Sequence, residues 1–458
     1  MATHVAFLPP AIRLLIQENH LADMIKEPLV PQNLFRQGIE REKWNAKSGE
    51  SLIITRNGTL APVVAASTPR TDPTPQAPTL EQWGVTAENL QGAVEIDIRQ
   101  NYHTITQEFR RQIGSLGLQA GTSVSRWVRS KLFQSYGGGH TWLTAGVLLG
   151  GATLTVQSIS GFTHNFNTDG RLVPVSAATP ISITVDGETV SVVAATPTNP
   201  ALPHGAGTLT LAVGVVAGHL INVPVLAATR PRIIRVGGAT TTRGIGAGNL
   251  ITLTQINSGV AYLRTLGVPT FSDGRYRCHL SPEAVRQLRE DAAWQLQVRG
   301  VPDHERVTGF EVGQLSGCTF IENAESPTYY NVAAGEDFNG AVTSAQTGGQ
   351  NICRTIITGP GTVVEHYVPE DDFETTPSTA GFGKREMLGK WVDQGNYVKG
   401  LVEGIHIYFR LPLDAKGERS TVTWSWTGDY GVPTDFRAQV NSQAAYKRAV
   451  IVESCDLG

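Results

Sequence analysis

Hydrophobic residues recur every three or four positions between residues 103 and 135, and this spacing predicts one long amphipathic helix. The stripe consists of Ile105, Phe109, Ile113, Leu116, Ala120, Val124, Val128 and Leu132. Thr104 followed by Gln107 predicts a capping box in the first turn. The helix also contains Gly114, Gly117 and Gly121. Each glycine costs a helix about 1 kcal/mol relative to alanine, so we expect a bend or a break there.

An extended pattern precedes this helix. Residues 52–64 form one candidate limb and residues 80–98 the other, where Val94, Ile96 and Ile98 alternate with polar residues. The segment between the limbs is rich in proline, with Pro69, Pro73, Pro75 and Pro78. A two-stranded projection is marginally stable in water by itself, so we expect it to lie on another surface. In a lone enzyme this projection would be a flexible lid. In an assembly it would be a loop that extends onto a neighbouring molecule.

The first 50 residues contain one short amphipathic helix candidate, at residues 11–25. Pro28, Pro31 and the charged run at residues 41–43 follow it. This composition is typical both of an arm that packs on another surface and of a partly ordered terminus, and both interpretations stay open.

The composition changes between residues 140 and 229, where the only charged residues are Asp169, Arg171, Asp186 and Glu188. Short β-branched runs alternate there with Gly, Pro, Asn and Thr. The candidate strands are residues 154–159, 181–190, 208–213 and 219–225. Asp186 and Gly187 provide the positive φ angles of a type I′ hairpin turn. We therefore predict an inserted β domain, a small sandwich or barrel.

After a linker at residues 236–249, rich in Gly and Thr, a helical pattern covers residues 254–266 and buries Ile256, Val260 and Leu263. A second helix starts with Ser281 as N-cap and Pro282 at the first helical position, and we expect it to continue to Trp294. Its inner face consists of Val285, Leu288 and Ala292.

The rest of the chain reads as strands and loops. Residues 323–351 are polar and rich in glycine, and we expect a loop on the outside of the body. Strands are predicted at residues 354–357, 362–368, 401–411, 421–427 and 444–452. No repeat of about 20 to 50 residues is visible, which disfavours a solenoid or propeller.

Length and charge limit the possible functions. The chain has 458 residues, more than the roughly 250 to 300 that one hydrophobic core serves, so we expect several core-bearing units. Its formal net charge of -3 gives no basic excess of the kind that tight nucleic-acid binding needs. No apolar run reaches the length of a membrane span, about 18 residues, so no membrane is expected as a partner.

Four cysteines, Cys278, Cys318, Cys353 and Cys455, are widely spaced and contain no Cys-x-x-Cys pair. This spacing excludes a zinc knuckle and a dense disulfide framework. We expect buried, inert thiols. An inter-subunit disulfide is the alternative, mainly for Cys455 near the end of the sequence, where we expect exposure.

No residue is predicted to be catalytic, to bind a cofactor or to ligate a metal. Gly383-Lys384 lacks the remainder of a phosphate-binding loop, and Asn249 stands where a dinucleotide motif after Gly244 needs glycine. His304-Glu305 lacks the second histidine of a zinc protease. The acidic run at residues 370–374 reads as a solvated turn, with a divalent-cation site as the alternative. The tryptophans are spread out and read as packing or subunit contacts: Trp83, Trp127, Trp294, Trp391, Trp424 and Trp426.

Three short motifs follow one another after residue 260. The first is Ala261-Tyr262-Leu263 with Gly267 and Pro269. The second is the segment HLSP at residues 279–282 with LREDAAW at residues 288–294. The third is FEVGQLSGCTFIE at residues 310–322. Preceded by the extended loop and the long helix, this order resembles the tailed-phage major capsid proteins of the Hong Kong 97-type fold.

The resemblance implies an α+β fold with six parts. They are an N-terminal arm (1–50), an extended loop with flanking strands (51–102), a spine helix (103–139), the inserted β domain (140–236), an axial domain (237–400) and C-terminal peripheral and axial strands (401–458). It implies a non-enzymatic shell protein of a double-stranded DNA bacteriophage, made in the host bacterial cytoplasm and located in the virion. It further implies hexamers and pentamers of this chain, a portal and weak, non-specific contact with packaged DNA.

Two departures from the family pattern limit what can be transferred. Some members join their subunits by a lysine to asparagine bond from the extended loop, but residues 51–100 contain no lysine, so we predict no such bond. Noncovalent contacts, the inserted domain or a cement protein would then reinforce the shell. Some members also begin with a long scaffolding segment, and the short arm here implies a separate scaffolding protein.

Two other classes of protein stay open as alternatives. The β-rich composition of residues 150–235 is also typical of a phage tail or fibre protein, although such a protein would be expected to show repeats. An enzyme with a lid loop is the other alternative. We can name no pair of nucleophile and base for it.

Overall fold

The chain divides into two compact units, and each unit gathers three separate segments. The first unit consists of Met1–Leu52, Thr86–Val128 and Glu365–Tyr430, and the second of Ile53–Val85, Arg129–Val364 and Gly431–Gly458. The computed structural model describes residues 20–32, 34–37, 39–44, 49–57, 60, 72, 75, 80–298, 311–329, 351–368, 387–388, 391–393, 397–410, 419–435 and 444–456.

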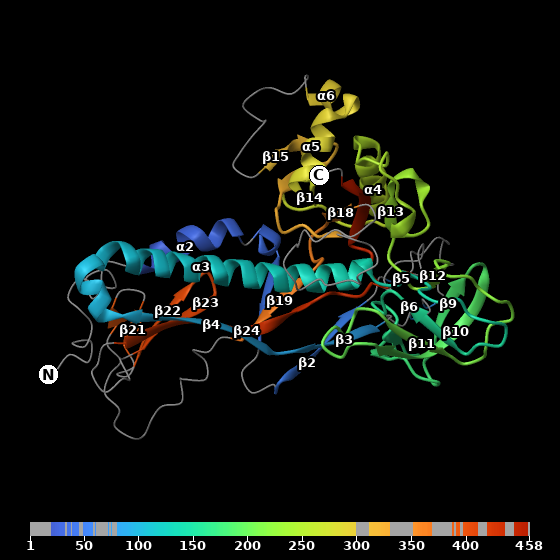
Figure 1. Cartoon of the computed structure of the whole chain (residues 1–458), viewed down its shortest axis with the longest axis horizontal. Coiled ribbons are helices and arrows are strands. Elements are labelled where there is room, and N and C mark those ends of the chain that lie inside the picture. The colour runs from blue at the N-terminus through green and yellow to red at the C-terminus, as the bar shows by residue number, and fades with distance from the viewer. Residues whose placement is uncertain are drawn as a thin grey trace. The chain divides into compact units, whose positions relative to one another are not determined.

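An eight-stranded sheet and the part of a long helix up to Val128 belong to the first unit (Figure 1). The sheet order is β1 (Glu40–Lys43), β19 (Val364–Tyr367), β24 (Arg419–Gly431), β23 (Ile405–Arg410), β22 (Tyr397–Val402), β21 (Trp391–Asp393) and β20 (Met387–Leu388), and β4 (Glu88–Asp97) pairs with β24. The helix is α3 (Ile98–Gly137). Its Gln119 Oε1 accepts a hydrogen bond from Trp424 Nε1 of β24 at 3.3 Å, which fixes helix against sheet.

The apolar stripe correctly predicted α3, but its start and its glycines were misjudged. The helix begins at Ile98, so Thr104 and Gln107 lie inside it and form no capping box at its start. No break occurs at the three glycines. Gly117 is instead needed for close packing, because a Cβ there would lie 2.7 Å from the backbone oxygen of Ile25.

The N-terminal arm packs on its own unit in its described part. The helix α2 covers His20–Gln32, later than the expected residues 11–25, of which 11–19 lie outside the described residues. The short helix η2 (Leu34–Arg36) and strand β1 follow. Ile25, Leu29, Phe35 and Trp44 are each at most 2% exposed, so the arm is part of the core of this unit.

The expected second limb of the extended loop is two strands with different partners. The strands β2 (Ser51–Asn57) and β3 (Leu80–Thr86) form a two-stranded ribbon. After Ala87 the chain enters β4, which pairs along its whole length with β24. The alternation at Val94 and Ile96 therefore belongs to the large sheet, and Ile98 already belongs to α3.

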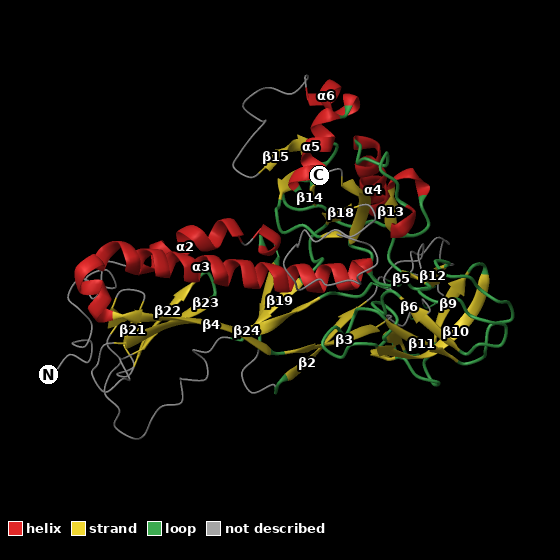
Figure 2. Cartoon of the chain, viewed as in Figure 1, coloured by secondary structure: helices red, strands yellow, loops and turns green. Residues whose placement is uncertain are grey.

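The inserted domain of the second unit is a closed six-stranded barrel, one of the two predicted forms. Its order is β5 (His140–Trp142), β12 (Pro224–Ala227), β9 (Ile181–Val185), β10 (Glu188–Pro197), β11 (Gly207–Leu211) and β6 (Thr153–Val156). The two end strands of this order, β5 and β6, meet through the bridge between Leu143 and Val156 and the hydrogen bond from Gln157 N to Trp142 O. Figure 2 shows only strands and loops in this domain.

The hairpin signal in the inserted domain was accurate, whereas β5, β7 (His164–Phe166) and β8 (Leu172–Pro174) were not predicted and the strand predicted at residues 154–159 ends at Val156. Asp186 and Gly187 have φ angles of 46° and 86° and join β9 to β10 in the predicted two-residue turn. Residues 219–225 do not form one strand, since β12 starts at Pro224. The ribbon of β7 and β8 completes the domain. Its core contains fully buried Leu154, Ile183, Val185 and Leu209 at the centre.

A second, mixed sheet forms the remainder of this unit. The order is β13 (Ile233–Arg235), β25 (Ala449–Asp456), β18 (Asn351–Thr358), β14 (Tyr276–Leu280), β16 (Cys318–Glu322) and β15 (Glu311–Leu315), with β17 (Thr328–Tyr329) paired to β18. The pairs of β13 with β25 and of β14 with β16 are parallel. Ile256, Leu263, Cys278, Phe320 and Val450 lie in its core.

Both predicted helices of this unit are present, and the predicted start signal at Ser281 is confirmed. The helix α4 (Leu253–Thr265) begins with a capping box of Thr252 and Gln255. The helix α5 (Pro282–Glu290) begins at Ser281, whose Oγ accepts a hydrogen bond from Ala284 N at 3.2 Å. The predicted continuation to Trp294 is interrupted at Asp291, and a separate helix α6 covers Ala292–Val298. Among the described residues, no helix is long and apolar enough to cross a membrane.

The linker at residues 236–249 and the loop at 323–351 are more structured than expected in their described parts. The linker contains the 3-10 turns η3 (Val236–Gly238) and η4 (Thr242–Gly244), and Ile245 is 3% exposed. Asn323 and Ser326 are buried, and β17 pairs with β18. The described parts of both segments therefore pack on the mixed sheet.

Two expectations about the last third of the chain differ from the structure. Residues 401–411 are not one strand, because Glu403 and Gly404, with φ angles of 50° and 79°, turn the chain from β22 into β23. The expected boundary at residue 400 also does not separate two sheets. β19 to β24 belong to the eight-stranded sheet, whereas β25 returns to the mixed sheet.

Candidate interaction surfaces

The base of the extended loop is fixed to its own unit. In β3, the side chains of Glu81, Trp83 and Val85 are at most 6% exposed, and Glu81 Oε2 accepts a hydrogen bond from Thr434 Oγ1 at 3.2 Å. Arg56 of β2 contacts Asp435 at 3.1 Å. The strands at the base therefore need no neighbouring chain for their support, contrary to the expectation for the whole loop. Residues 61–71, at the far end, lie outside the described part.

A buried ion pair anchors the arm in the first unit. Arg36 Nε donates to Glu365 Oε2 at 2.9 Å, and the Glu365 side chain is fully buried. Trp426 Nε1 donates to the other carboxylate oxygen at 3.2 Å, and Arg36 Nη1 donates to the backbone oxygen of Glu403 at 2.9 Å. Both charges thus have several partners, as burial of an ion pair requires.

A second buried cluster joins the linker to the mixed sheet. Glu453 of β25 accepts hydrogen bonds from Arg235 and Arg354, each at 2.8 Å, and from Thr242 Oγ1 at 2.9 Å. Burial disfavours the charged carboxylate, but the two guanidinium groups outweigh it and lower the pKa of Glu453 to about 2. The carboxylate therefore stays ionised at neutral pH and holds two arginines.

One end of the barrel carries an exposed hydrophobic surface, which we call the apolar tip. Its six side chains are between 54% and 85% exposed: Leu148, Leu149, Val213, Val216, Leu220 and Ile221. They come from two loops that are bridged at Val147 and His219. Glu188 fixes the second loop, because it accepts hydrogen bonds from Val216 N at 2.6 Å and Ala217 N at 3.2 Å.

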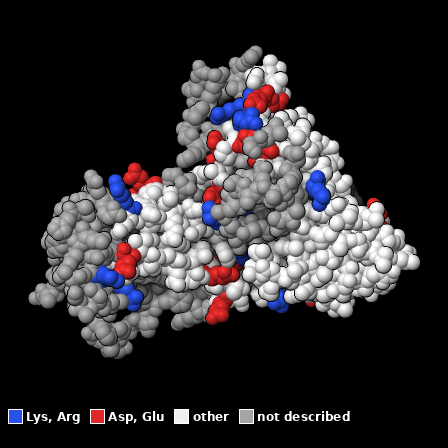
Figure 3. All heavy atoms as spheres, viewed as in Figure 1, with Lys and Arg blue, Asp and Glu red and all other residues white. Residues whose placement is uncertain are grey.

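Charged residues are rare around the apolar tip, and Figure 3 shows a mostly uncharged face over the inserted domain. The sequence predicted the low charge but not the position of the exposed apolar side chains, because alternation alone does not identify loop ends. Soluble monomers rarely expose contiguous apolar surface of this kind, so the apolar tip is a candidate contact with another molecule.

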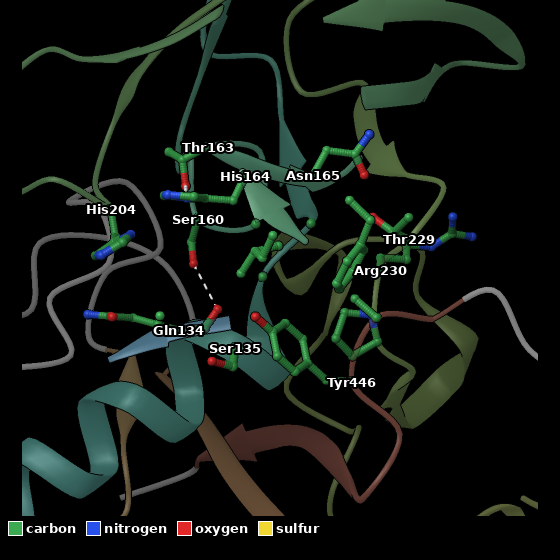
Figure 4. Close-up of a pocket in the computed structure, with 18 residues that line it drawn as sticks. Gln134, Ser135, Ser160, Thr163, His164, Asn165, His204, Thr229, Arg230 and Tyr446 are labelled. Carbon is green, nitrogen blue, oxygen red and sulfur yellow. Dashed lines mark hydrogen bonds between the residues drawn. The ribbon is translucent and has the colours of Figure 1, made fainter. Parts of the chain in front are cut away.

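A polar pocket of about 280 Å³ lies where the barrel joins the end of α3 (Figure 4). His164, His204 and Ser160 line it from the barrel and Gln134 from the helix. Ser160 Oγ donates to Gln134 O at 3.0 Å. Burial lowers the pKa of both histidines, so they are neutral at neutral pH. Within the described residues, no group of three metal-ligating side chains occurs here or elsewhere.

All four cysteines are free and buried. Burial raises the pKa of the Cys318 and Cys353 thiols to about 12, and the pKa of Cys278 and Cys455 also rises. A protonated thiol is a poor nucleophile, which agrees with the predicted inert character. The expectation of an exposed Cys455 was wrong, because this side chain lies in β25 and is 0% exposed. It cannot reach another subunit without unfolding of that strand.

Several other residues singled out in the sequence can be placed. Trp83, Trp294, Trp424 and Trp426 are at most 6% exposed and pack inside their units, as predicted. The acidic run at residues 370–374, His304-Glu305 and Gly383-Lys384 lie outside the described residues. Gly244 belongs to η4 and Asn249 O accepts a hydrogen bond from Cys455 N at 2.8 Å, so this segment has a packing role.

Comparisons with known proteins give matches in structure but not in sequence. No protein-family model and no curated protein matches the chain. The capsid of Ralstonia phage GP4 is 13% identical, with a TM-score of 0.46 over 92% of this chain and 87% of that chain. The Cyanophage Pam1 capsid asymmetric unit is 13% identical, with a TM-score of 0.45 over 92% and 89% of the two chains. The holo-SrpI encapsulin complex from Synechococcus elongatus is 8% identical, with a TM-score of 0.37 over 94% and 90%. Phage capsids, the class that the sequence motifs resemble, are thus among the solved structures that match this chain.

Proposed function

We propose that this chain is the major capsid protein of a tailed double-stranded DNA bacteriophage and assembles into an icosahedral shell. The observation that carries the proposal is the order of elements: an extended ribbon (β2 and β3), the strand β4, the 40-residue helix α3 along a large sheet, and a separate mixed sheet with α4 and α5. This is the order that the resemblance implies for a shell subunit.

The exposed surfaces support an assembling protein over a lone enzyme. The apolar tip exposes six large hydrophobic side chains, and Ile53 on the ribbon is 50% exposed. A shell subunit makes several modest contacts with identical neighbours, and the closed symmetry multiplies their effect. Contacts of this kind cover such side chains after assembly.

The finer parts of the proposal concern partners. Hexamers and pentamers of this chain would form the shell, with a portal, a separate scaffolding protein and a cement protein as further components. Contact with packaged DNA would be weak and non-specific, because the net charge of the chain is -3. The protein would be made in the bacterial cytoplasm and end in the virion, without an enzymatic role.

The test is particle formation. The full chain is co-expressed with the scaffolding protein of its phage and examined by light scattering and electron microscopy. We expect closed particles in the megadalton range, since a shell needs many copies of a 49.2 kDa subunit. Only small oligomers under all assembly conditions would contradict the proposal.

A deletion of residues 63–78 tests the extended loop. We expect a soluble subunit with an unchanged circular dichroism spectrum and no particles, because the ribbon base is held by Arg56, Glu81 and Trp83 within its own chain. The control replaces residues 63–78 by a Gly-Ser segment of equal length, which keeps the length of the loop and removes its side chains. Normal particles from the deletion variant would show that the loop has no part in assembly.

A further inference from the structure

A hollow of about 380 Å³ lies on the second unit, where the barrel, β13 and α4 meet. The segment 226–235 lines it with three arginines, Arg230, Arg232 and Arg235. His140, Thr240 and Tyr262 also contribute to its wall. No carboxylate side chain lines the hollow within the described residues.

The arginines have too few negative partners among the described residues. Arg235 shares Glu453 with Arg354, and its Nη1 donates to the backbone oxygen of Thr240 at 2.9 Å. Arg230 donates from Nη1 to the backbone oxygen of Ala227 at 2.9 Å, and Arg232 lies over the ring of Tyr262 at 4.9 Å from its centroid. The three arginines that line the hollow thus carry more positive charge than the one carboxylate behind the wall, which Arg235 shares, can offset.

This excess of positive charge is costly when water is partly excluded. Burial lowers the pKa of Arg230, and the charge of Arg235 lowers it further. His140 adds no charge, because burial and Arg235 lower its pKa to about 3 and its Nε2 faces Pro231 O at 2.8 Å. Figure 4 shows the guanidinium end of Arg230 directed away from the labelled His164 and His204, although Arg230 also lines the polar pocket. An anion in the arginine-lined hollow would relieve the repulsion.

We propose that the hollow formed by Arg230, Arg232 and Arg235 binds a phosphoryl oxyanion. A planar guanidinium donates two parallel hydrogen bonds to phosphate oxygens, and Arg230 and Arg232 keep free donors for this purpose. Free phosphate offers more acceptor oxygens and more negative charge than a carboxylate. A nucleic-acid backbone offers one negative charge at each phosphodiester, so either source suits a wall with three guanidinium groups. The proposal does not depend on shell assembly.

Two sources supply the same chemistry: free phosphate and the phosphodiester backbone of a nucleic acid. The full chain is titrated by calorimetry with inorganic phosphate and, separately, with a short DNA duplex at fixed salt. The variants are Arg230→Gln and Arg232→Gln. Arg243→Gln is the matched control, because Arg243 is exposed and nearby but outside the wall of the hollow.

We expect binding by the unaltered chain and a loss of about ten-fold or more in affinity in each hollow variant, since charged hydrogen bonds are removed. Arg243→Gln should change affinity less than about two-fold. Arg232→Lys keeps the positive charge but lacks the two parallel donors of a guanidinium. Its affinity should therefore lie between those of the unaltered chain and Arg232→Gln. Circular dichroism checks that each variant is folded.

The two titrations distinguish the sources. If the hollow variants lose affinity only for inorganic phosphate, free phosphate is the ligand. If they lose affinity only for the duplex, the ligand is the phosphodiester backbone. Absence of binding of either probe to the unaltered chain would overturn the proposal. Equal binding by the unaltered chain, Arg230→Gln and Arg232→Gln would overturn it as well.

Discussion

At the residue scale, stability in both units depends on charges that are buried with their partners. The pair of Arg36 and Glu365 lies 329 residues apart in the sequence and holds the arm to the large sheet. Without Arg36, the buried Glu365 carboxylate keeps the partly exposed Arg41, at 3.2 Å, as a cationic partner. A buried charge that loses its buried partner still costs far more than the loss of an exposed pair.

Arg36→Gln should therefore lower the free energy of unfolding by roughly 3 to 5 kcal/mol. Lys26→Gln is the control, because Lys26 forms an exposed pair with Glu403 in the same unit and the loss of an exposed pair should change the free energy of unfolding far less. Denaturant unfolding followed by circular dichroism measures both. Similar values for the two variants would contradict the anchoring role of Arg36.

A buried histidine gives the second unit a pH dependence. In the unfolded chain His140 binds a proton below its ordinary pKa of 6.5, whereas in the folded chain burial and Arg235 lower this pKa to about 3. Between these values the unfolded state binds more protons. The free energy of unfolding should therefore fall as the pH falls through this window, by up to about 1.4 kcal/mol per pH unit.

His140→Gln should make this fall shallower, since glutamine does not titrate and its amide can still donate to Pro231 O. Unfolding is measured between pH 7.5 and 4, where the two proteins should differ increasingly toward acid. If the free energies of unfolding of the two proteins change in parallel with pH, His140 does not contribute to the acid sensitivity.

Residue chemistry was predictable where its partner is close in sequence. Ser281 as a helix cap and Asp186-Gly187 as a turn act on backbone groups within a few residues. The partners of Glu365 and Glu453 are far away, so no local pattern could identify these pairs. Arg230, Arg232 and Arg235 were not singled out in the sequence, because only the fold shows that their charges share one wall.

At the element scale, α3 shows that a glycine in a helix has two different physical roles. A Cβ at Gly117 would meet the backbone oxygen of Ile25 at 2.7 Å, whereas a Cβ at Gly114 would have no atom within 4 Å. Helix propensity predicted a defect at both positions. Packing of α2 against α3 decides the role of Gly117, and this contact is not visible in either segment alone.

The two glycines give a matched pair of variants. Gly114→Ala should raise the free energy of unfolding by up to about 1 kcal/mol, because alanine favours the helix. Gly117→Ala should lower it by about 1 kcal/mol or more, because the backbone of α2 must move. Thermal unfolding of both variants tests the difference in sign. A stabilising Gly117→Ala would mean that α2 does not pack closely there.

Strand existence was more predictable than strand pairing. The alternation in residues 80–98 correctly indicated extended structure, but β3 pairs with β2 and β4 with β24, which no periodicity distinguishes. The division of residues 401–411 had a usable signal, because Glu403-Gly404 is a two-residue loop between alternating runs. The hydrophobic content of that segment masked the turn.

At the scale of the whole molecule, the inserted barrel has its own closed sheet and its own core. The chain enters at Gly139 and leaves at Ala227, and the Ala227 N to Gly139 O hydrogen bond of 2.9 Å places these ends together. A domain with adjacent ends and a separate core is expected to be removable.

A variant in which a short glycine linker replaces residues 140–227 should therefore fold, with the mixed sheet intact. Circular dichroism and thermal unfolding measure the fold, and particle formation then measures the role of the apolar tip. An insoluble product would show that the barrel is structural. The isolated residues 139–230 are the complementary control and should unfold cooperatively.

The position of β25 has a consequence for how the protein is made. This strand lies between β13 and β18 in the mixed sheet, although it comes from residues 449–456. A ribosome releases the early strands long before their central neighbour exists, so the mixed sheet closes only after translation has passed residue 456. Until then β13 has no partner among the described strands of this sheet.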